Sequence, residues 1–124
     1  MSGIGIEPAA VHELHGARFA SYVSPSSGSE QLCAWRVRVA AGLEGQEHRV
    51  SHEEVFLVLS GTPALTVDGV HARLDPGAVA LAPAGARLRL DNPGPDDAEL
   101  WVTTSVGLRA ELAAGTWVSP PWTR

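Results

Sequence analysis

Short hydrophobic runs, separated by turn-forming residues, occupy most of this chain. In Leu32–Ala40 (LCAWRVRVA), apolar side chains alternate with two arginines, and this two-residue period is typical of a strand with one buried face. Val55–Leu59 (VFLVL) is apolar throughout, which is typical of a strand buried on both faces. These patterns predict β-strands rather than helices.

Turn signals divide the chain between these runs. Asp68-Gly69 lies between two apolar segments and is a strong signal for a β-hairpin. Pro76-Gly77 and Pro83-Ala84-Gly85 turn the chain on either side of a further run. We expect the remaining strands at Ala17–Val23, Leu65–Val67, Val70–Leu74, Ala78–Ala82, Arg87–Leu90 and Glu99–Val106. Strands this short and evenly spaced predict an antiparallel β-sandwich or barrel, with no helix beyond a turn at Ala110–Ala114.

The length of 124 residues suits one domain with a core of its own. We expect a single domain over 1–124, with its core at about 17–107, an N-terminal arm and a tail rich in Trp and Pro. Hydrophobic residues make up 44% and charged residues 19%, which is typical of a globular protein. The 13 Gly and 9 Pro supply the turns that an all-β fold needs.

Charge and targeting signals narrow the function classes. The net charge is −5, and the nine basic residues are scattered arginines, so we expect no nucleic-acid partner. No apolar run reaches the ~18 residues of a membrane span, and the N-terminus lacks the pattern of a signal peptide. The single Cys33 forms no internal disulfide. We therefore expect a cytoplasmic protein, and the absence of Lys is typical of a GC-rich bacterial genome.

The first of two spacing patterns in the middle of the chain resembles a motif of the cupin family. That family motif reads G-x5-H-x-H-x3-E-x6-G. Gly42, His48, Glu54 and Gly61 stand at the matching positions of this chain. Val50 stands where the motif has its second His.

The second pattern resembles the other cupin motif, G-x5-P-x-G-x2-H-x3-N. Gly77, Pro83, Gly85 and Asn92 occupy the matching positions, and Leu88 replaces the His. Because glycine and proline set the turns of a barrel, two independent spacing matches mainly indicate the fold.

The resemblance implies an all-β fold, the antiparallel double-stranded β-helix or jelly-roll barrel of cupins, with a small-molecule pocket inside. We expect Val55–Leu59 and Ala78–Ala82 to be its central strands. The resemblance also implies a homodimer that pairs through a sheet face, and we expect Trp117 and Trp122 of the tail to be buried in it.

In metal-binding cupins, both His and the Glu of the first motif and the His of the second converge on one cation. Here His48 and Glu54 remain. His52 offers a substitute, because an extended segment 48–54 would place His48, His52 and Glu54 on one face as a two-His, one-carboxylate set. In the family this segment bends, and a His at position 52 then points outward. We therefore keep two alternatives, one divalent transition metal (Zn, Fe, Mn or Ni) or no metal.

His48 and Glu54 are also candidates for general acid/base catalysis beside an apolar pocket, or for a purely structural hydrogen-bonded pair. The pocket is expected to be lined by Val50, Phe56, Leu88 and Leu90. The expected function is small-molecule chemistry of the isomerase, cyclase, oxygenase or decarboxylase type. The alternatives are a non-catalytic binding module without metal and a dimeric scaffold with a vestigial site.

Overall fold

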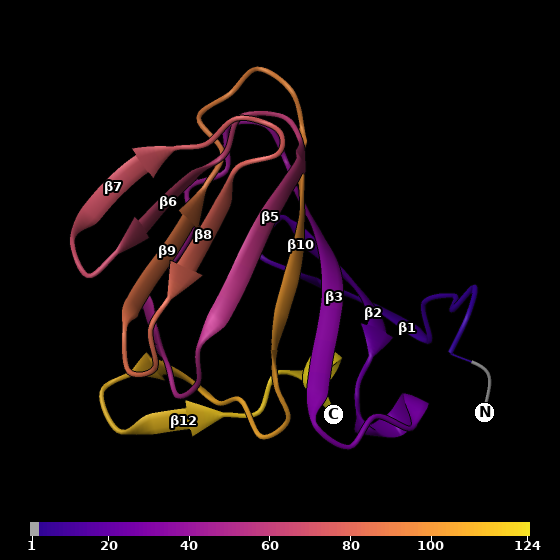
Figure 1. Cartoon of the computed structure of the whole chain (residues 1–124). Helices are drawn as coiled ribbons and strands as arrows, with labels where there is room; N and C mark the ends of the chain where they lie inside the picture. The colour runs from indigo at the N-terminus through magenta and orange to yellow at the C-terminus, as the bar shows by residue number, and fades with distance from the viewer. Residues whose placement is uncertain (1–2) are drawn as a thin grey trace.

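Two antiparallel six-stranded sheets, packed face to face, make up the structure, a computed structural model that describes residues 3–124 (Figure 1). The strands are β1 (Ala10–Leu14), β2 (Ala17–Val23), β3 (Leu32–Val39), β4 (His48–Val50), β5 (Glu54–Ser60), β6 (Ala64–Val67), β7 (Val70–Arg73), β8 (Val79–Ala82), β9 (Arg87–Asp91), β10 (Ala98–Ser105), β11 (Ala110–Ala113) and β12 (Thr116–Val118). Two short 3-10 helices are η1 (Pro25–Ser27) and η2 (Pro121–Thr123). Sheet A has the strand order β1-β2-β3-β10-β5-β8, and sheet B has the order β12-β11-β4-β9-β6-β7.

The chain passes repeatedly from one sheet to the other. β3, β5, β8 and β10 lie in sheet A, whereas the strands between them, β4, β6, β7 and β9, lie in sheet B. This winding is that of a jelly roll, so the predicted all-β antiparallel fold is confirmed. None of the helices in residues 3–124 is both long enough and apolar enough to cross a membrane.

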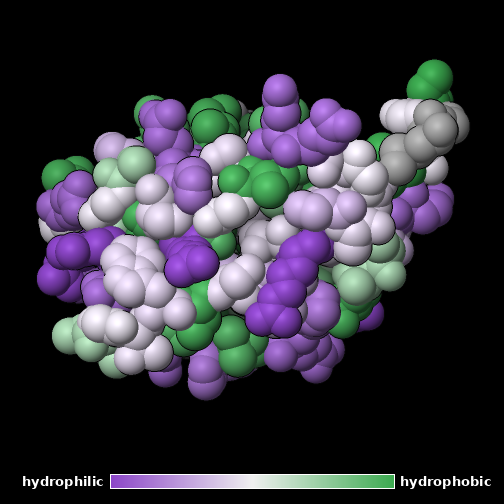
Figure 2. All heavy atoms as spheres, turned by 90° about the horizontal axis from the view of Figure 1, so that it is seen from below, coloured by the Kyte–Doolittle hydropathy of each residue, from purple (hydrophilic) through white to green (hydrophobic). Residues whose placement is uncertain are grey.

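Hydrophobic side chains also appear on the surface. On the end of the molecule that carries β12, they form small separate groups among hydrophilic side chains (Figure 2). The N-terminal arm extends away from the sheets in both views (Figures 1 and 2), and Ile4 on it is 90% exposed.

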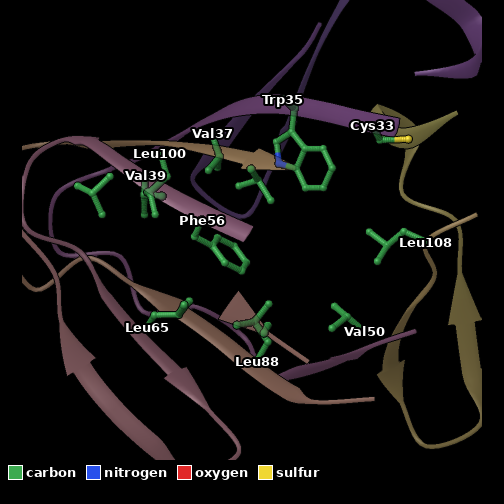
Figure 3. Packing of buried hydrophobic residues seen from close by; sticks show 13 residues of the cluster. Cys33, Trp35, Val37, Val39, Val50, Phe56, Leu65, Leu88, Leu100 and Leu108 are labelled. Carbon is green, nitrogen blue, oxygen red and sulfur yellow. The ribbon is translucent and has the colours of Figure 1, made fainter. Parts of the chain in front are cut away.

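The hydrophobic core fills the space between the sheets (Figure 3). Trp35 and Phe56 point into it from sheet A, and Val50, Leu65 and Leu88 point into it from sheet B. Burying each such side chain contributes about 1.5–3 kcal/mol. Because strand side chains alternate, each strand of the core presents every second residue to this space.

The prediction that Val55–Leu59 is buried on both faces is wrong. Phe56 and Val58 are buried, but Val55 is 40% exposed and Leu59 is 38% exposed. The reason is that sheet B covers only one face of sheet A. Ala78–Ala82 is not a central strand either, because β8 lies at the edge of sheet A.

The predicted helical turn at Ala110–Ala114 is also wrong, because Ala110–Ala113 forms β11. β11 pairs with β4 and with β12, and Ala110 lies opposite Val50 at the rim of the core. Strand pairing with a segment sixty residues away along the chain (110 − 50) therefore overrides the local preference for helix.

Trp122 packs within its own chain rather than being left for a partner. Its ring stacks on Phe19 with the centroids 3.7 Å apart and the planes 2° apart. The backbone carbonyl of Trp122 accepts a 2.9 Å hydrogen bond from the Ser21 hydroxyl. Trp117 is 39% exposed, so of the two tail tryptophans it is the one whose side chain is more available to a partner.

Gly61 and Gly77, both matched to motif positions, provide a test of the fold. Both have a left-handed backbone, with φ of +77° and +88°. A Cβ at Gly61 would lie 2.7 Å from the Cα of Ala98, whereas a Cβ at Gly77 would meet nothing within 4 Å. Gly77→Ala is therefore expected to cost about 1 kcal/mol from backbone strain alone. Gly61→Ala is expected to cost about 2 kcal/mol more because of the added overlap, measured by urea denaturation. Equal losses in the two variants would contradict this packing.

Candidate functional site

Glu54 is the first residue of β5, and its side chain points into the space between the sheets. Alternation along β5 turns Val55 outward and places Glu54 on the same face as Phe56. Its cross-strand neighbours are Ala82 on β8 and Thr104 on β10. Glu54 is only 4% exposed, which is rare for a carboxylate that has no cationic partner.

No hydrogen bond or ion pair within residues 3–124 reaches the carboxyl group of Glu54. The nearest polar neighbour in register, Thr104, donates its hydroxyl hydrogen to the backbone carbonyl of Glu53 at 2.6 Å. Among these residues, Nε of Arg49 is the one side-chain nitrogen or oxygen that is both inaccessible to solvent and without a hydrogen-bond partner. The Glu54 oxygens also have no partner, but they keep a small solvent-accessible area.

Burial raises the pKa of Glu54 to about 8, because the apolar surroundings disfavour the charged carboxylate. At neutral pH the side chain is therefore mainly a carboxylic acid. A neutral carboxylic acid has one O–H to donate, which an ionised carboxylate lacks.

His48 lies on β4, directly opposite Leu88 on β9 and two residues before Val50. These positions place its half-buried side chain on the inner face of sheet B. Its Nδ1 lies 3.1 Å from the backbone carbonyl of Gln46. Because a carbonyl only accepts, Nδ1 carries the hydrogen in this bond, and in the neutral imidazole Nε2 is then the acceptor. Glu54 is not its hydrogen-bond partner, so the structure does not contain the structural pair considered as an alternative.

His52 lies in the turn between β4 and β5. β4 ends at Val50 and β5 begins at Glu54, so the segment 48–54 is not extended, and the face-sharing argument for His52 is wrong. The Ser51 hydroxyl accepts a 2.7 Å hydrogen bond from the Arg109 backbone N–H, and it shares a second hydrogen bond of 2.7 Å with Nδ1 of His52.

The donor set does not fit a divalent metal. Among residues 3–124 there is no group of three or more His, Cys, Asp or Glu side chains that could hold a metal ion. The structure therefore does not bring His48, His52 and Glu54 together as the predicted ligand set. A catalytic metal commonly needs three protein ligands, and we derive no step through a metal.

The side chains expected to line a pocket are mostly core residues. Val50, Leu88 and Phe56 are 1%, 2% and 4% exposed, and Leu90 is half-buried. Phe56 points from sheet A toward the side of sheet B that carries Val50 and Leu88 (Figure 3). Their inward orientation is the one that the motif spacing predicts.

Two surface clefts lie elsewhere. One, of about 380 Å³, adjoins the β1–β2 turn and is lined in part by His15, Arg18 and Asp97. The other, of about 300 Å³, adjoins the N-terminal arm beside Tyr22. Neither is lined by the predicted pocket residues.

The sequence interpretation overlooked Thr104 and Ser51. Thr104 fixes the backbone beside Glu54, and Ser51 fixes the turn that carries His52. The two-residue period of the segment at 99–106 places position 104 on the same face as Leu100 and Val102, and this signal was available. No comparable signal marks Ser51, because its partner is 58 residues away.

The fold has several similar structures. An RmlC-like cupin from Shewanella frigidimarina NCIMB 400 is 23% identical with a TM-score of 0.67, over 85% of this chain and 87% of that chain. Salicylate 1,2-dioxygenase from Pseudoaminobacter salicylatoxidans, as an adduct with gentisate, is 20% identical with a TM-score of 0.72, over 86% of this chain and 31% of that chain. The cupin domain of Schizosaccharomyces pombe Cnp3 is 22% identical with a TM-score of 0.64, over 78% of this chain and 68% of that chain. At these identities, the likeness concerns the fold.

Comparison of sequences gives two further matches. A family model described as a cupin domain matches residues 35–105. A curated protein named endoribonuclease YbeY, from Myxococcus xanthus (strain DK1622), is 28% identical over 99 residues, which are 79% of this chain and 34% of that protein. The chain thus spans about a third of the length of that relative.

Proposed function

The chain belongs to the cupin family, and from this premise we propose that it binds a small, uncharged, apolar molecule between its sheets, with Glu54 as a neutral acid that donates a hydrogen bond to it. The observation behind this proposal is the buried carboxyl group of Glu54, which lacks any partner within residues 3–124.

The chemistry of the inner face selects the ligand class. A buried polar group without a hydrogen bond costs roughly 1–3 kcal/mol, and a ligand that accepts the Glu54 proton in a hydrogen bond offsets this cost. The core side chains of this inner face, among them Val50, Phe56 and Leu88, are apolar. A molecule with one carbonyl or ether oxygen on an apolar skeleton fits both conditions. The salicylate 1,2-dioxygenase neighbour was determined with gentisate, which supports small organic ligands for this fold.

The catalytic form of the proposal adds His48 to Glu54 and uses no metal. Glu54 delivers its proton to the ligand oxygen, and Nε2 of His48 takes a proton from the ligand, which is an isomerisation or cyclisation with no net change in protons on the ligand. Solvent then returns a proton to Glu54 and removes one from His48. A non-catalytic binding module needs only the first contact, so binding to Glu54 is the feature common to both forms.

We also propose that the protein is a homodimer in the bacterial cytoplasm. Cys33 is buried and free, and burial raises the pKa of its thiol, which suits an unreactive thiol in a reducing compartment. We do not extend the endoribonuclease activity to this chain, because two thirds of that relative has no counterpart here and the arginines form no stripe.

Acetophenone, an apolar molecule with one carbonyl acceptor, is a suitable probe. We expect it to shift the NMR signals of the Val50 and Leu88 methyl groups in the wild-type protein. Glu54→Leu is expected to weaken binding about 2- to 10-fold, the range for loss of one hydrogen bond. Glu53→Gln, at the exposed neighbouring position, is the matched control and should bind as the wild type does. Unshifted methyl signals, or equal affinity for wild type and Glu54→Leu, would overturn the proposal.

A further inference from the structure

The outer face of sheet B carries a row of side chains that the chemistry between the sheets does not use. Val50 points into the core, so Arg49 before it on β4 points outward. Strand register places Glu111 of β11 on one side of Arg49 and Arg87 of β9 on the other. Trp117 of β12 lies opposite Glu111 and extends the row by one strand. We call Trp117, Glu111, Arg49 and Arg87 the outer row.

Arg49 is the unsatisfied member of the outer row. Its side chain is half-buried, yet no hydrogen bond or ion pair within the described residues 3–124 reaches its guanidinium. Its Nε is inaccessible to solvent, whereas its two terminal nitrogens keep solvent-accessible area. A partly buried cation without a partner is costly, and two terminal guanidinium nitrogens match the two oxygens of a carboxylate. The group that completes this position is therefore an anion.

The charged neighbours of Arg49 do not supply that anion. Glu111 is directly opposite, but its carboxylate accepts a 2.9 Å hydrogen bond from the backbone N–H of Gly115 in the β11–β12 turn. Arg87 is a second cation, and it pairs with Glu47 at 3.4 Å. Like charges directly opposite one another on a sheet are destabilising, so an anion bound at Arg49 would also offset this repulsion.

Trp117 indicates what the rest of the ligand is. Its side chain is exposed, and two strand spacings, roughly 10 Å, separate its backbone from that of Arg49. A small molecule can therefore place a carboxylate on the guanidinium and a ring against the indole, and contacts between aromatic rings are favourable. Glu111 and Glu47 disfavour a second negative charge. We propose that the outer row binds a small aromatic monocarboxylate, with Arg49 on the carboxylate and Trp117 on the ring.

The outer row and Glu54 lie on opposite faces of sheet B, so this site goes beyond the proposed function and is tested separately. NMR of the full chain, titrated with benzoate at constant ionic strength, follows two signals of the row. One is the Nε–H of Arg49, which exchanges slowly because solvent does not reach it, and the other is the indole N–H of Trp117. We expect benzoate to shift both signals with a Kd on the order of 1 mM. Acetophenone, which has nearly the same shape and no charge, is expected to leave both unchanged.

Substitutions assign the binding to each residue. Arg49→Gln is expected to weaken benzoate binding about 10-fold or more, followed at the Trp117 signal, because a charged hydrogen-bonded contact is lost. Trp117→Ala is expected to weaken it about 2- to 10-fold, followed at the Arg49 signal, because the ring contact is lost. Arg18→Gln is the matched control, since Arg18 is an exposed arginine on sheet A, and it should bind benzoate as the wild type does.

Arg49→Lys is a second variant, so the test does not depend on the folding of one protein. It keeps the charge but removes the pair of terminal nitrogens, and it is expected to weaken benzoate binding about 3- to 10-fold. Signals that do not move below about 20 mM benzoate would overturn the site. Equal affinities of the Arg49 and Arg18 variants would overturn the role of Arg49, and equal shifts with acetophenone would overturn the recognition of a carboxylate. The methyl signals of Val50 and Leu88 report on the space between the sheets independently of these outcomes.

Discussion

The double variant Val50→His with Leu88→His is expected to bind Zn²⁺ at least 100-fold more tightly than the wild type. Position 88 lies directly opposite His48 in the β4–β9 register, and position 50 lies two residues further along the inner face of β4. Each substitution adds an imidazole at the place where the cupin motif has a metal ligand. Three or four ligands hold a divalent metal where two rarely suffice.

The affinity is measured by competition with a chelator, and by the shift in Tm when Zn²⁺ is added. Two buried imidazoles destabilise the protein without metal, and bound Zn²⁺ should offset this loss, because a ligand that binds only the folded state stabilises it. Val58→His with Leu65→His is the control, since both positions are buried but neither is a ligand position of the two motifs. If the motif variant binds Zn²⁺ no better than the wild type, positions 50 and 88 do not correspond to the family's ligand positions.

Glu54→Gln is expected to abolish a strong pH dependence of stability. The pKa of Glu54 is about 8 in the folded protein and 4.5 in its ordinary state, so between these values the folded protein binds more protons than the unfolded one. Stability due to this group is fully present below pH 4.5 and is lost as the pH rises toward 8. At about 1.4 kcal/mol per pH unit, the loss reaches roughly 3 kcal/mol at pH 7. Gln keeps the shape without the charge, so the variant should match the wild type at pH 4 and exceed it by about 3 kcal/mol at pH 7.

Urea denaturation from pH 4 to pH 8.5 provides this comparison. Glu53→Gln is the control, because Glu53 is exposed and its removal should leave the pH dependence unchanged. A stability difference between Glu54→Gln and wild type that stays constant with pH would mean that folding does not raise the pKa of Glu54 above its ordinary value.

Local turn chemistry explains which strands were predictable. Ala17–Val23 agrees with β2 at both ends, and Asp68-Gly69 does join β6 to β7. His48–Val50 was not expected as a strand, because three residues carry too little periodicity and its partners β9 and β11 are about forty to sixty residues away. The outward side of Val55–Leu59 was not predictable for a different reason. Sequence pattern shows that a strand is apolar but not what covers each of its faces.

The site was predictable only as far as motif spacing determines which side chains point into the space between the sheets. The spacing placed Val50 and Leu88 on the inner face, where the structure has them. The resemblance implied that the segment 48–54 bends, but the spacing did not indicate the contact that holds the turn at 51–53, between Ser51 and Arg109, 58 residues away. The isolation of Glu54 also depends on a distant residue, because Thr104 gives its hydroxyl hydrogen to the Glu53 carbonyl instead.

The most direct test of the neutral acid between the sheets is the pKa of Glu54 itself. It can be measured by NMR, from the ¹³C shift of the Glu54 side-chain carboxyl carbon between pH 3 and pH 10, with Glu54→Gln used to assign the signal. The structure predicts a midpoint at about 8, because burial without a partner disfavours the charged form. A midpoint near the ordinary value of 4.5 would show an ionised carboxylate at neutral pH and would contradict Glu54 as a hydrogen-bond donor.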